Sequence, residues 1–512
     1  MKKNIKNILC FIGLTAMLLA GCKNSLDLKP ISSLGDASYW QSADQFDAFA
    51  YGIYNRFRSH NTNFQYLGEL RSDVFGTDPG STSAFTGEAT QGVEKMWLQT
   101  IDIDNSGVSD FGQFYSNINQ INLLINKVNA TSILSDAKKS EFLGMAYGLR
   151  AFYYFQLYRT WGKVIIQTEP IFSIDIETLA KAASDLPAVM TLIKADIDLS
   201  NTNYGTNYAF STKDKKGVWS KSATQMLKAE VYLWTAHRGG GTADATIAKT
   251  ALTDIQLNTS LSLVSNFANV FSTTNKDNSE IIFASKNKID EATLSFIGNY
   301  VPQTGLIVNF YDAAVPRKFD VVTDNYGGLL RIPTKIATYE KFNDSDSRKN
   351  LTIQAAYSKS GANYIIAGAF LKKYVGEQSA GSRAYTNDFP IYRYADLLLL
   401  LAEAKVMLSQ DPSTEINLVR ARAYGSNYNA LTLGYPTQAI DVNPNEAILK
   451  ERFLEFIGEG KRWYDLRRMG DSYVYANTSL TTATSYKLFW PIDRATLTNN
   501  RLLKQTDGYP PF

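Results

Sequence analysis

The most distinctive stretch of this chain is ERFLEFIGEGKRWYDLRR, residues 451–468. Its acidic residues Glu451, Glu455 and Glu459 recur every four positions, so they would share one face of a helix that ran through all three. Two such carboxylates could suggest glycoside hydrolysis, but a catalytic pair must flank the glycosidic bond from across a cleft. The basic residues interleaved with them are Arg452, Lys461, Arg462, Arg467 and Arg468. We therefore interpret the cluster as ion pairs and helix caps, with a surface hydrolase as the alternative.

Helical periodicity extends from this stretch over most of the chain. From about residue 38, apolar side chains recur at the three- and four-residue spacing of an amphipathic helix. We predict further helices at 111–128, 140–161, 186–199, 220–235, 243–257 and 394–409, then one that ends at 424 and one that begins at 444. Helix pairs at intervals of about thirty to forty residues are typical of a tetratricopeptide-like array. The chain is therefore predicted to be mainly α-helical.

Two segments interrupt this pattern. Residues 281–283 predict a short strand, and an irregular insertion follows at about 284–343, where Pro302, Pro316 and Pro333 break the periodicity. Earlier in the chain, residues 76–92 form a loop rich in turn residues and long enough to suggest a functional surface. Loops of this kind often carry ligand contacts.

The N-terminus has the features of a lipoprotein signal. Three lysines precede an apolar run from Ile8 to Ala20, which is shorter than the roughly 18–20 residues that span a bilayer. Small residues then lead to Cys22, whose thiol would carry the lipid. We predict a signal peptide at 1–21 and a lipidated tether at 22–37. An ordinary cleaved signal is the alternative, and it would leave a free cysteine in an oxidising compartment.

Composition limits the classes of ligand. Cleavage before Cys22 would lower the 52 basic residues to 49, equal to the 49 acidic residues. Nucleic acid requires clustered Lys and Arg, so we expect no nucleic-acid partner. The other cysteine, Cys10, lies in the signal, and His60 and His237 lack partners at metal-ligand spacing, so no metal or other cofactor is expected. With 30 Tyr, 27 Phe and 7 Trp, the chain has many rings that could stack on an uncharged sugar.

Several motifs in order resemble one known family. Besides residues 451–468, they are Arg393-Tyr394-Ala395-Asp396, the segment 416–423, Phe489-Trp490-Pro491-Ile492, the segment 149–155 and the segment 279–283. Together they closely resemble the SusD/RagB family of outer-membrane nutrient-binding lipoproteins, and the resemblance spans nearly the whole chain.

This resemblance implies a fold and a role. The implied fold is a tetratricopeptide-like right-handed superhelix of about eight scaffold helices, with an irregular, loop-rich, ligand-facing subdomain, all within a SusD-like domain at 38–512. The implied role is non-enzymatic: a lipid-anchored protein on the outward face of the outer membrane binds an oligosaccharide. It delivers the oligosaccharide to a SusC-like TonB-dependent transporter. A peptide or other nutrient is the alternative cargo.

Ligand residues can be nominated from the same comparison. Leu67 to Asp73 resembles a family segment that often borders the binding face, and Trp97 follows the polar loop in a position suited to stacking. The candidates are Arg71, Asp73, Trp97, Tyr300, Tyr311 and Tyr326. As a set they would form a shallow platform, with Arg71 and Asp73 hydrogen bonding to hydroxyls. For each residue alone, packing in the core is the alternative.

Overall fold

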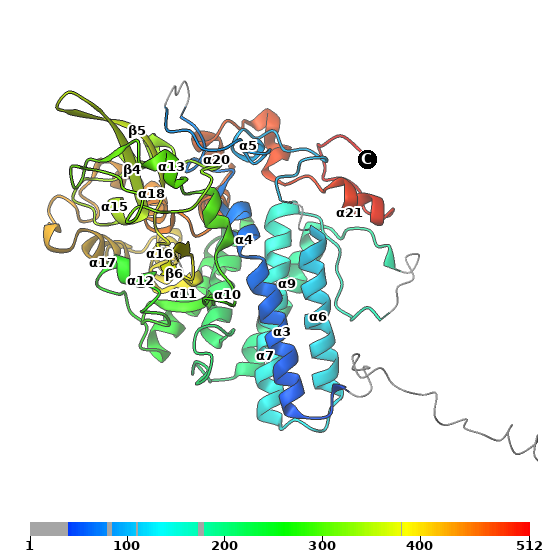
Figure 1. Cartoon of the computed structure of the whole chain (residues 1–512). Coiled ribbons are helices and arrows are strands. Elements are labelled where there is room, and N and C mark those ends of the chain that lie inside the picture. Colours follow the sequence, from blue (N-terminus) through cyan, green and yellow to red (C-terminus); the bar gives the residue numbers. More distant parts are fainter. Residues whose placement is uncertain (1–38, 79–83, 109–110, 173–178, 380) are drawn as a thin grey trace, which may run out of the picture.

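The computed structural model describes residues 39–512 apart from 79–83, 109–110, 173–178 and 380, and Figure 1 shows the whole chain. The predicted signal at 1–21, the lipid site Cys22 and the tether at 22–37 lie outside the described residues. Within the described part, no helix combines the length and the apolar character that crossing a membrane would require.

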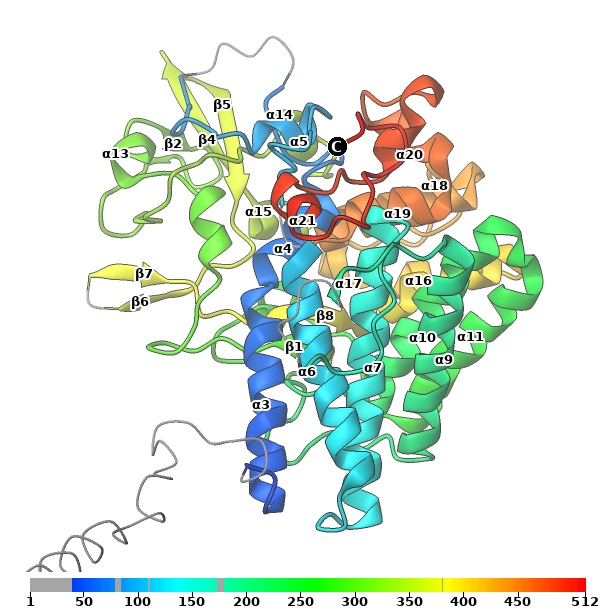
Figure 2. The same ribbon diagram turned by 90° about the vertical axis from the view of Figure 1, so that its right-hand side faces the viewer.

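Eight helices of the described part pack on one another in chain order and form a scaffold. They are α6 (Phe111–Ala130), α7 (Asp136–Trp161), α9 (Leu186–Tyr204), α10 (Lys221–Thr235), α11 (Gly241–Asn258), α16 (Tyr394–Met407), α17 (Ser413–Tyr424) and α18 (Pro444–Phe456). Each contacts the next from α6 to α16, and α16 contacts both α17 and α18. Figure 1 shows α6, α7 and α9 upright beside one another, and Figure 2 shows α10 and α11 continuing the row. The mainly helical fold predicted from the sequence is confirmed.

Local sequence signals explain where these helices begin and end. Ser135 precedes α7 and accepts a hydrogen bond from the amide of Lys138, and Gly162 ends this helix with a φ of 80°. Asp185 caps α9 in the same way, and Pro187 suits the first turn because it has no amide hydrogen to satisfy. The caps supply partners for amides that the first turn of a helix leaves unpaired.

Another long helix, α3 (Ala43–Ser59), packs on α6 and leads into α4 (Asn61–Glu69) and α5 (Glu94–Trp97). Its buried face consists of Phe46, Ala50, Ile53 and Phe57, at the three- and four-residue spacing predicted from the sequence. The chain thus runs up α3 and α4 toward the end of the scaffold where α5 lies (Figure 2).

The irregular part contains three small sheets. Strand β1 (Ile281–Ser285), which confirms the predicted strand, pairs antiparallel with β8 (Phe389–Arg393). A four-stranded sheet has the order β3 (Arg317–Lys318), β2 (Tyr311–Asp312), β4 (Ile353–Ser360), β5 (Asn363–Leu371), and β6 (Glu377–Ser379) pairs with β7 (Ser382–Ala384). Because β2 and β3 join the β4–β5 hairpin, the irregular part continues beyond the end expected at about residue 343 (Figure 2).

Short helices complete the described part. They are η1 (Ala236–Gly240), α12 (Phe267–Val270), η2 (Ser295–Asn299), α13 (Thr304–Ile307), α14 (Ile336–Glu340), α15 (Arg348–Thr352), η3 (Gly425–Asn427), η4 (Ala439–Val442), α19 (Arg462–Met469), α20 (Asp471–Asn477), η5 (Thr482–Leu488) and α21 (Arg494–Asn499).

The acidic residues of the 451–468 stretch lie in a buried network of ion pairs. Arg393 pairs with Glu455 at 2.6 Å and with Glu459 at 2.8 Å, and Arg348 pairs with Glu455 at 3.1 Å. Arg420 pairs with Glu451 at 3.1 Å. The ion pairing predicted from the sequence is confirmed, but these partners come from other elements and not from the interleaved basic residues.

Ion pairing also sets the protonation of this network. Burial opposes the charged form of Glu455, but the neighbouring Arg422, Arg393 and Arg348 outweigh it and hold the pKa of this carboxyl below its usual range. The pKa of Glu459 is lowered for the same reason, with Arg393 and Lys373 as the neighbouring cations. These carboxylates are therefore charged and fully engaged in the core.

Two glycines bring the end of α18 against α4. The chain turns through Gly458 and Gly460, with φ values of 85° and 69°, and the amides of both donate hydrogen bonds to the carboxylate of Glu69. Burial raises the pKa of Glu69 to about 7, although these amides favour its charged form. A Cβ at Gly68 would lie 1.7 Å from the carbonyl oxygen of Gly460, so the two backbones meet with no room for a side chain.

We predict that Gly68→Ala destabilises the protein by about 3 kcal/mol, because the added methyl group overlaps backbone atoms that cannot move independently. Urea denaturation followed by circular dichroism measures the change. Gly52→Ala is the control: its Cβ meets nothing within 4 Å in α3, and alanine favours a helix, so stability should stay equal or rise. Equal stability of both variants would contradict this packing.

We predict that Glu455→Gln lowers the free energy of unfolding by about 3–5 kcal/mol, because it leaves buried arginines without their counter-charge. The same denaturation measurement tests this. Glu141→Gln is the matched control, since the Glu141 side chain is 61% exposed and an exposed pair contributes little. A Glu455→Gln protein as stable as the wild type would show that the network does not hold the fold.

Candidate functional site

A small cavity lies between the polar loop predicted at 76–92 and the irregular part. It has a volume of about 150 Å³, and it is lined by the loop residues 76–78, 85–88 and 90, by Trp97, by residues 330, 331, 333, 334 and 336, and by the β5 residues 367–369. Pockets that enclose a whole small ligand usually measure about 300–1,000 Å³. This cavity could therefore hold one end or one unit of a longer ligand.

Trp97 forms one wall and is positioned by the backbone of the loop. It closes the short helix α5 and is half-buried. A Cβ at Gly76 would lie 2.7 Å from Cδ1 of the Trp97 ring, and Gly76 adopts a φ of 113°, which favours glycine. Among the described residues, no group accepts a hydrogen bond from the indole N–H of Trp97. The ring therefore offers both stacking surface and a donor.

Backbone pairing fixes the opposite wall. Thr334 forms isolated β-bridges to Phe75 on one side and to Ala369 of β5 on the other. The amide of Gly76 donates to the carbonyl of Pro333 at 2.9 Å, and the amide of Glu88 donates to the carbonyl of Leu329 at 2.8 Å. The loop is thus attached at two points to the segment that faces it.

Two polar atoms of this wall have no partner in the described part of the chain. Nε of Arg331 and Oγ1 of Thr334 are both buried without a hydrogen bond. Buried polar groups are nearly always paired, so each such atom calls for a physical reason. The terminal nitrogen of Arg331 pairs with Glu88 at 3.0 Å, and Gln303 donates to the other carboxylate oxygen of Glu88 at 2.6 Å. A ligand with hydroxyl groups would satisfy the two unpaired atoms.

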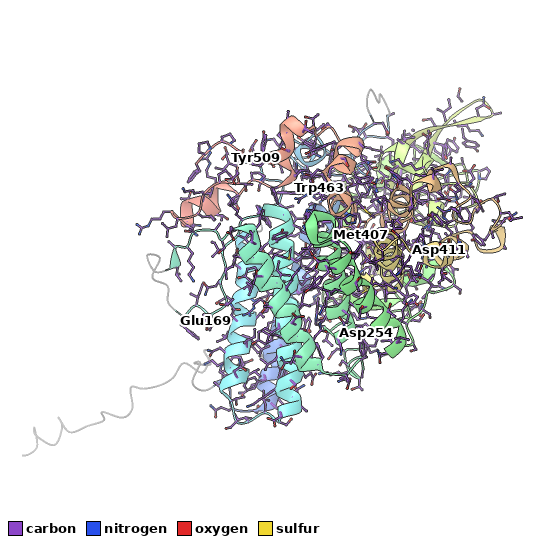
Figure 3. The ribbon with its side chains drawn as sticks, turned by 180° about the vertical axis from the view of Figure 1, so that it is seen from behind. Glu169, Asp254, Met407, Asp411, Trp463 and Tyr509 are labelled. Atoms are coloured by element: carbon purple, nitrogen blue, oxygen red, sulfur yellow. The ribbon has the colours of Figure 1, made fainter. Side chains whose placement is uncertain are left out.

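Of the nominated residues, Arg71 lies in the core. Its guanidinium carbon is 4.7 Å from the ring centroid of Trp463 and 4.4 Å from that of Trp490, and its Nε donates to Gln99 at 2.8 Å. Burial lowers the pKa of Arg71 to about 10, so it stays charged at neutral pH. Figure 3 shows Trp463 at the end of the scaffold, close to Tyr509 of the C-terminal segment. Arg71 therefore joins this segment to the scaffold.

Asp73 is engaged in a similar way. Its carboxylate pairs with Arg462 at 2.8 Å and with Lys341 at 2.8 Å, and its side chain is 9% exposed. Burial opposes the charged form, but the two cations outweigh it and hold the pKa of Asp73 below its usual range. Asp73 links the stretch 451–468 to the irregular part.

The three nominated tyrosines lie in different surroundings. Tyr300 is fully buried, and its hydroxyl donates to Gln65. The ring of Tyr326 is buried against Phe370, with a centroid distance of 4.9 Å. Tyr311 is half-buried on β2 beside Tyr364. Of the nominated rings, the structure places Trp97 in the cavity and leaves part of Tyr311 accessible.

The sequence reasoning missed Glu88, Arg331 and Thr334. Glu88 lies in the loop that was predicted to be functional, and the other two flank Pro333 in the irregular insertion. Their position in irregular segments was the only feature of the sequence that pointed to a binding role. The unpaired atoms of Arg331 and Thr334 can be recognised only from the tertiary structure.

The histidines have structural partners. Nδ1 of His60 lies 2.9 Å from the hydroxyl of Tyr153, and burial lowers the pKa of His60 to about 4. Nε2 of His237 lies 3.1 Å from Glu403. No group of three or more His, Cys, Asp or Glu side chains within the described ranges is placed to hold a metal ion.

Two family models match the chain. A model described as "SusD family" matches residues 331–509, and one described as "Starch-binding associating with outer membrane" matches residues 26–252. Among solved structures, NanU of B. fragilis is 44% identical, with a TM-score of 0.87 over 94% of this chain and 100% of NanU. A SusD superfamily protein from Bacteroides vulgatus ATCC 8482 is 38% identical, with a TM-score of 0.84 over 92% of this chain and 100% of that protein.

A more distant structure shares the fold. Surface glycan-binding protein A from Bacteroides thetaiotaomicron, solved in complex with laminarihexaose, is 18% identical, with a TM-score of 0.67 over 91% of this chain and 100% of that protein. The scaffold is accordingly the tetratricopeptide-like helical array that the sequence predicts. The family model, and the 38% identity over nearly the full length of both chains, show that this chain belongs to the SusD family.

Proposed function

We propose that this protein is a non-enzymatic binding protein that captures an oligosaccharide at the outer membrane through the cavity beside Trp97. The observation that carries the proposal is that Trp97 lines the same cavity as Arg331 and Thr334, whose Nε and Oγ1 atoms are buried without a hydrogen-bond partner among the described residues. An aromatic face packs on the apolar C–H surface of a sugar, and polar atoms of this kind bind its hydroxyls. Tyr311 would extend the contact, and Arg71, Asp73, Tyr300 and Tyr326 would support the surface from within.

Relatives with this fold support a glycan as the cargo. One of them holds laminarihexaose in its solved structure, and the description of a matching family model names starch. The neutral balance of the chain after residue 21 agrees with an uncharged ligand.

A binding role without catalysis has support from the carboxylates. Glu451, Glu455 and Glu459 are enclosed in ion pairs. At the cavity, Asp78 accepts hydrogen bonds from the amides that begin α14, and Glu88 pairs with Arg331. These carboxylates therefore have structural partners, which argues against a hydrolase.

We further propose that a lipid on Cys22 holds the protein on the outward face of the outer membrane, where it delivers its cargo to a SusC-like TonB-dependent transporter. The lipoprotein pattern at residues 2–22 and the outer-membrane association named in the family description support this. A peptide remains the alternative cargo for the same transporter class.

We predict that Trp97→Ala weakens oligosaccharide binding by about tenfold, because stacking on one aromatic ring contributes roughly 0.5–1.5 kcal/mol in addition to the apolar area it buries. Isothermal titration calorimetry with a panel of neutral oligosaccharides measures this. Trp40→Ala is the matched control: Trp40 is also half-buried but precedes α3 and does not line the cavity, so binding should be unchanged. If no glycan bound to the wild type, or if a peptide bound instead, the glycan assignment would fail.

We predict that Cys22→Ala abolishes incorporation of labelled palmitate and removes the protein from the outer-membrane fraction, because acyl chains supply the membrane affinity. Cys10→Ala is the control, since Cys10 lies in the segment expected to be cleaved and its loss should leave lipid labelling intact. Continued labelling of the Cys22→Ala protein would refute lipidation at this residue.

A further inference from the structure

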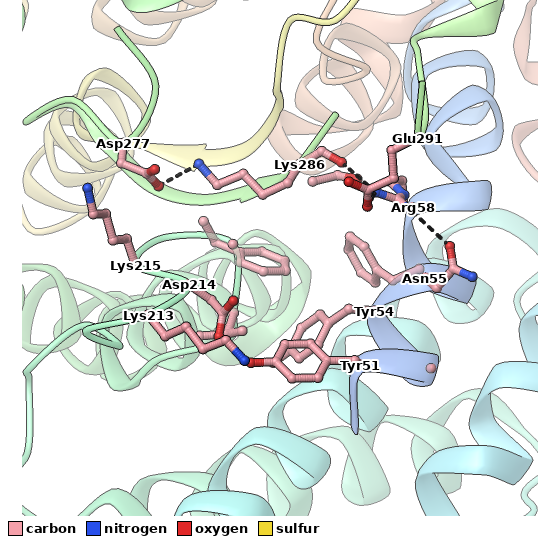
Figure 4. A pocket seen from close by; sticks show the side chains of 16 residues that line it. Tyr51, Tyr54, Asn55, Arg58, Lys213, Asp214, Lys215, Asp277, Lys286 and Glu291 are labelled. Carbon is pink, nitrogen blue, oxygen red and sulfur yellow. Dashed lines mark hydrogen bonds and ion pairs between the residues drawn. The ribbon is translucent and has the colours of Figure 1, made fainter. Parts of the chain in front are cut away.

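A second and larger cavity lies beside α3. It has a volume of about 760 Å³ and lies between the α3 residues 51–58, the turn 213–218 and the end of β1 (Figure 4). This volume falls within the range of about 300–1,000 Å³ that small-ligand pockets occupy. No residue lines both this cavity and the cavity beside Trp97. This cavity borders α3, whereas Trp97 lies in α5, and α4 comes between these two helices in the chain. It is therefore a separate candidate site.

One side of this cavity is aromatic. The ring of Tyr51 is 38% exposed, and its hydroxyl donates to Asp214 at 2.7 Å, which fixes the ring orientation. Deeper in the cavity, the rings of Phe57 and Phe283 pack with a centroid distance of 5.3 Å. An exposed, oriented ring above an apolar floor can receive the flat face of a sugar.

The carboxylates around the cavity already have partners. Glu291 pairs with Arg58 at 2.7 Å, and Asp277 pairs with Lys286, as Figure 4 shows. The remaining carboxylate, Asp214, accepts the hydrogen bond from Tyr51. Each negative group is therefore engaged before a ligand arrives.

Two lysines of the turn, Lys213 and Lys215, are exposed, and no carboxylate of the described residues lies within ion-pair distance of either ammonium group. The hydroxyl of Tyr51 and the nearby carboxylate of Asp214 raise the pKa of Lys213, so this ammonium group is charged and already touches the aromatic wall. Nζ of Lys213 lies 4.7 Å from the ring centroid of Tyr51, so a positive charge stands next to the aromatic wall. Lys215 adopts a φ of 46°, and the turn is closed by a hydrogen bond from the amide of Gly217 to the carbonyl of Asp214. This turn fixes the backbone from which both lysine side chains extend.

At the end of the cavity that β1 borders, a buried hydroxyl group lies in the wall. Ser285 is 4% exposed, lines the cavity, and its Oγ has no hydrogen-bond partner within the described ranges. Since buried polar groups are nearly always paired, this hydroxyl suggests that a polar group of a ligand hydrogen bonds to it.

We propose that this cavity is a second binding site, specific for a short acidic saccharide whose sugar ring stacks on Tyr51 and whose carboxylate pairs with Lys213, while Lys215 adds positive charge on the Asp277 side of the cavity (Figure 4). A hydroxyl of the same ligand would bind Ser285. Charge-assisted hydrogen bonds to a carboxylate are stronger than neutral ones, so the lysines would select an acidic sugar over a neutral sugar of the same size. This site goes beyond the proposed function and does not depend on it.

Isothermal titration calorimetry with digalacturonic acid tests the site. We expect binding by the wild type, and about tenfold weaker binding by the double variant Lys213→Ala/Lys215→Ala, because the charge-assisted contact with Lys213 and the nearby positive charge of Lys215 are lost. Lys318→Ala/Lys504→Ala is the matched control: it removes the same charge from two exposed lysines outside the cavity and should bind like the wild type. Equal binding by both double variants would overturn the proposal.

Additional titrations distinguish an acidic-saccharide site from general attraction of anions and from binding at the Trp97 cavity. Binding should weaken when salt is raised from about 50 mM to about 500 mM, because salt screens exposed charges. Maltose, a neutral disaccharide, and inorganic phosphate, an anion without a ring, should neither bind in the cavity nor compete with digalacturonic acid.

Two further variants separate this cavity from the one beside Trp97. Trp97→Ala should leave digalacturonic acid binding unchanged, and Ser285→Ala should weaken it. Absence of binding to the wild type, or equal competition by phosphate or maltose, would refute an acidic-saccharide site whether or not the Trp97 cavity binds glycan.

Discussion

The structure depends on a network of buried ion pairs, whose charged side chains are not in contact with water. Arg393 pairs with Glu280, which immediately precedes β1, with Glu455 in α18 and with Glu459 in the turn that follows, and each of these side chains is fully buried. Charges in the interior are tolerated only where every partner is present, because a single unpaired charge is strongly destabilising. The helical scaffold and the irregular part must therefore assemble together, which keeps the loops of the irregular part at a fixed place relative to the helices.

The helices were predictable because their signals are local. Periodicity and capping residues lie within one segment, so the bounds of α10 and α11 agree closely with the ranges read from the sequence. The partners of Glu451 and Glu455 were not predictable, because Arg348 and Arg393 are distant in the chain. The β4–β5 hairpin was missed for a related reason: its strands gain stability from pairing with β2, which local sequence does not report.

The residues nominated for ligand binding also divide into those that local sequence identifies and those that only the tertiary structure reveals. Trp97 was identified because it follows a polar loop, and the structure places it in a cavity. Arg71 has the residue type of a sugar contact, yet Trp463 and Trp490 enclose it. Residue type alone cannot separate an arginine that binds a ligand from one that holds two segments together. The unpaired Nε of Arg331 is visible only after the fold has brought it beside the loop, among the residues that the structure describes.

The two cavities also show what net charge does and does not determine. Equal numbers of acidic and basic residues after residue 21 reduce long-range attraction of charged polymers. Screening in salt, however, limits the influence of any charge to roughly 8–10 Å, so a ligand within a cavity responds to the few groups that line it. Within the described part of the chain, no carboxylate lies within ion-pair distance of Lys213 or Lys215, whereas Arg331 forms an ion pair with Glu88. A balanced net charge is therefore compatible with the two proposed sites, one for a neutral sugar and one for an acidic sugar.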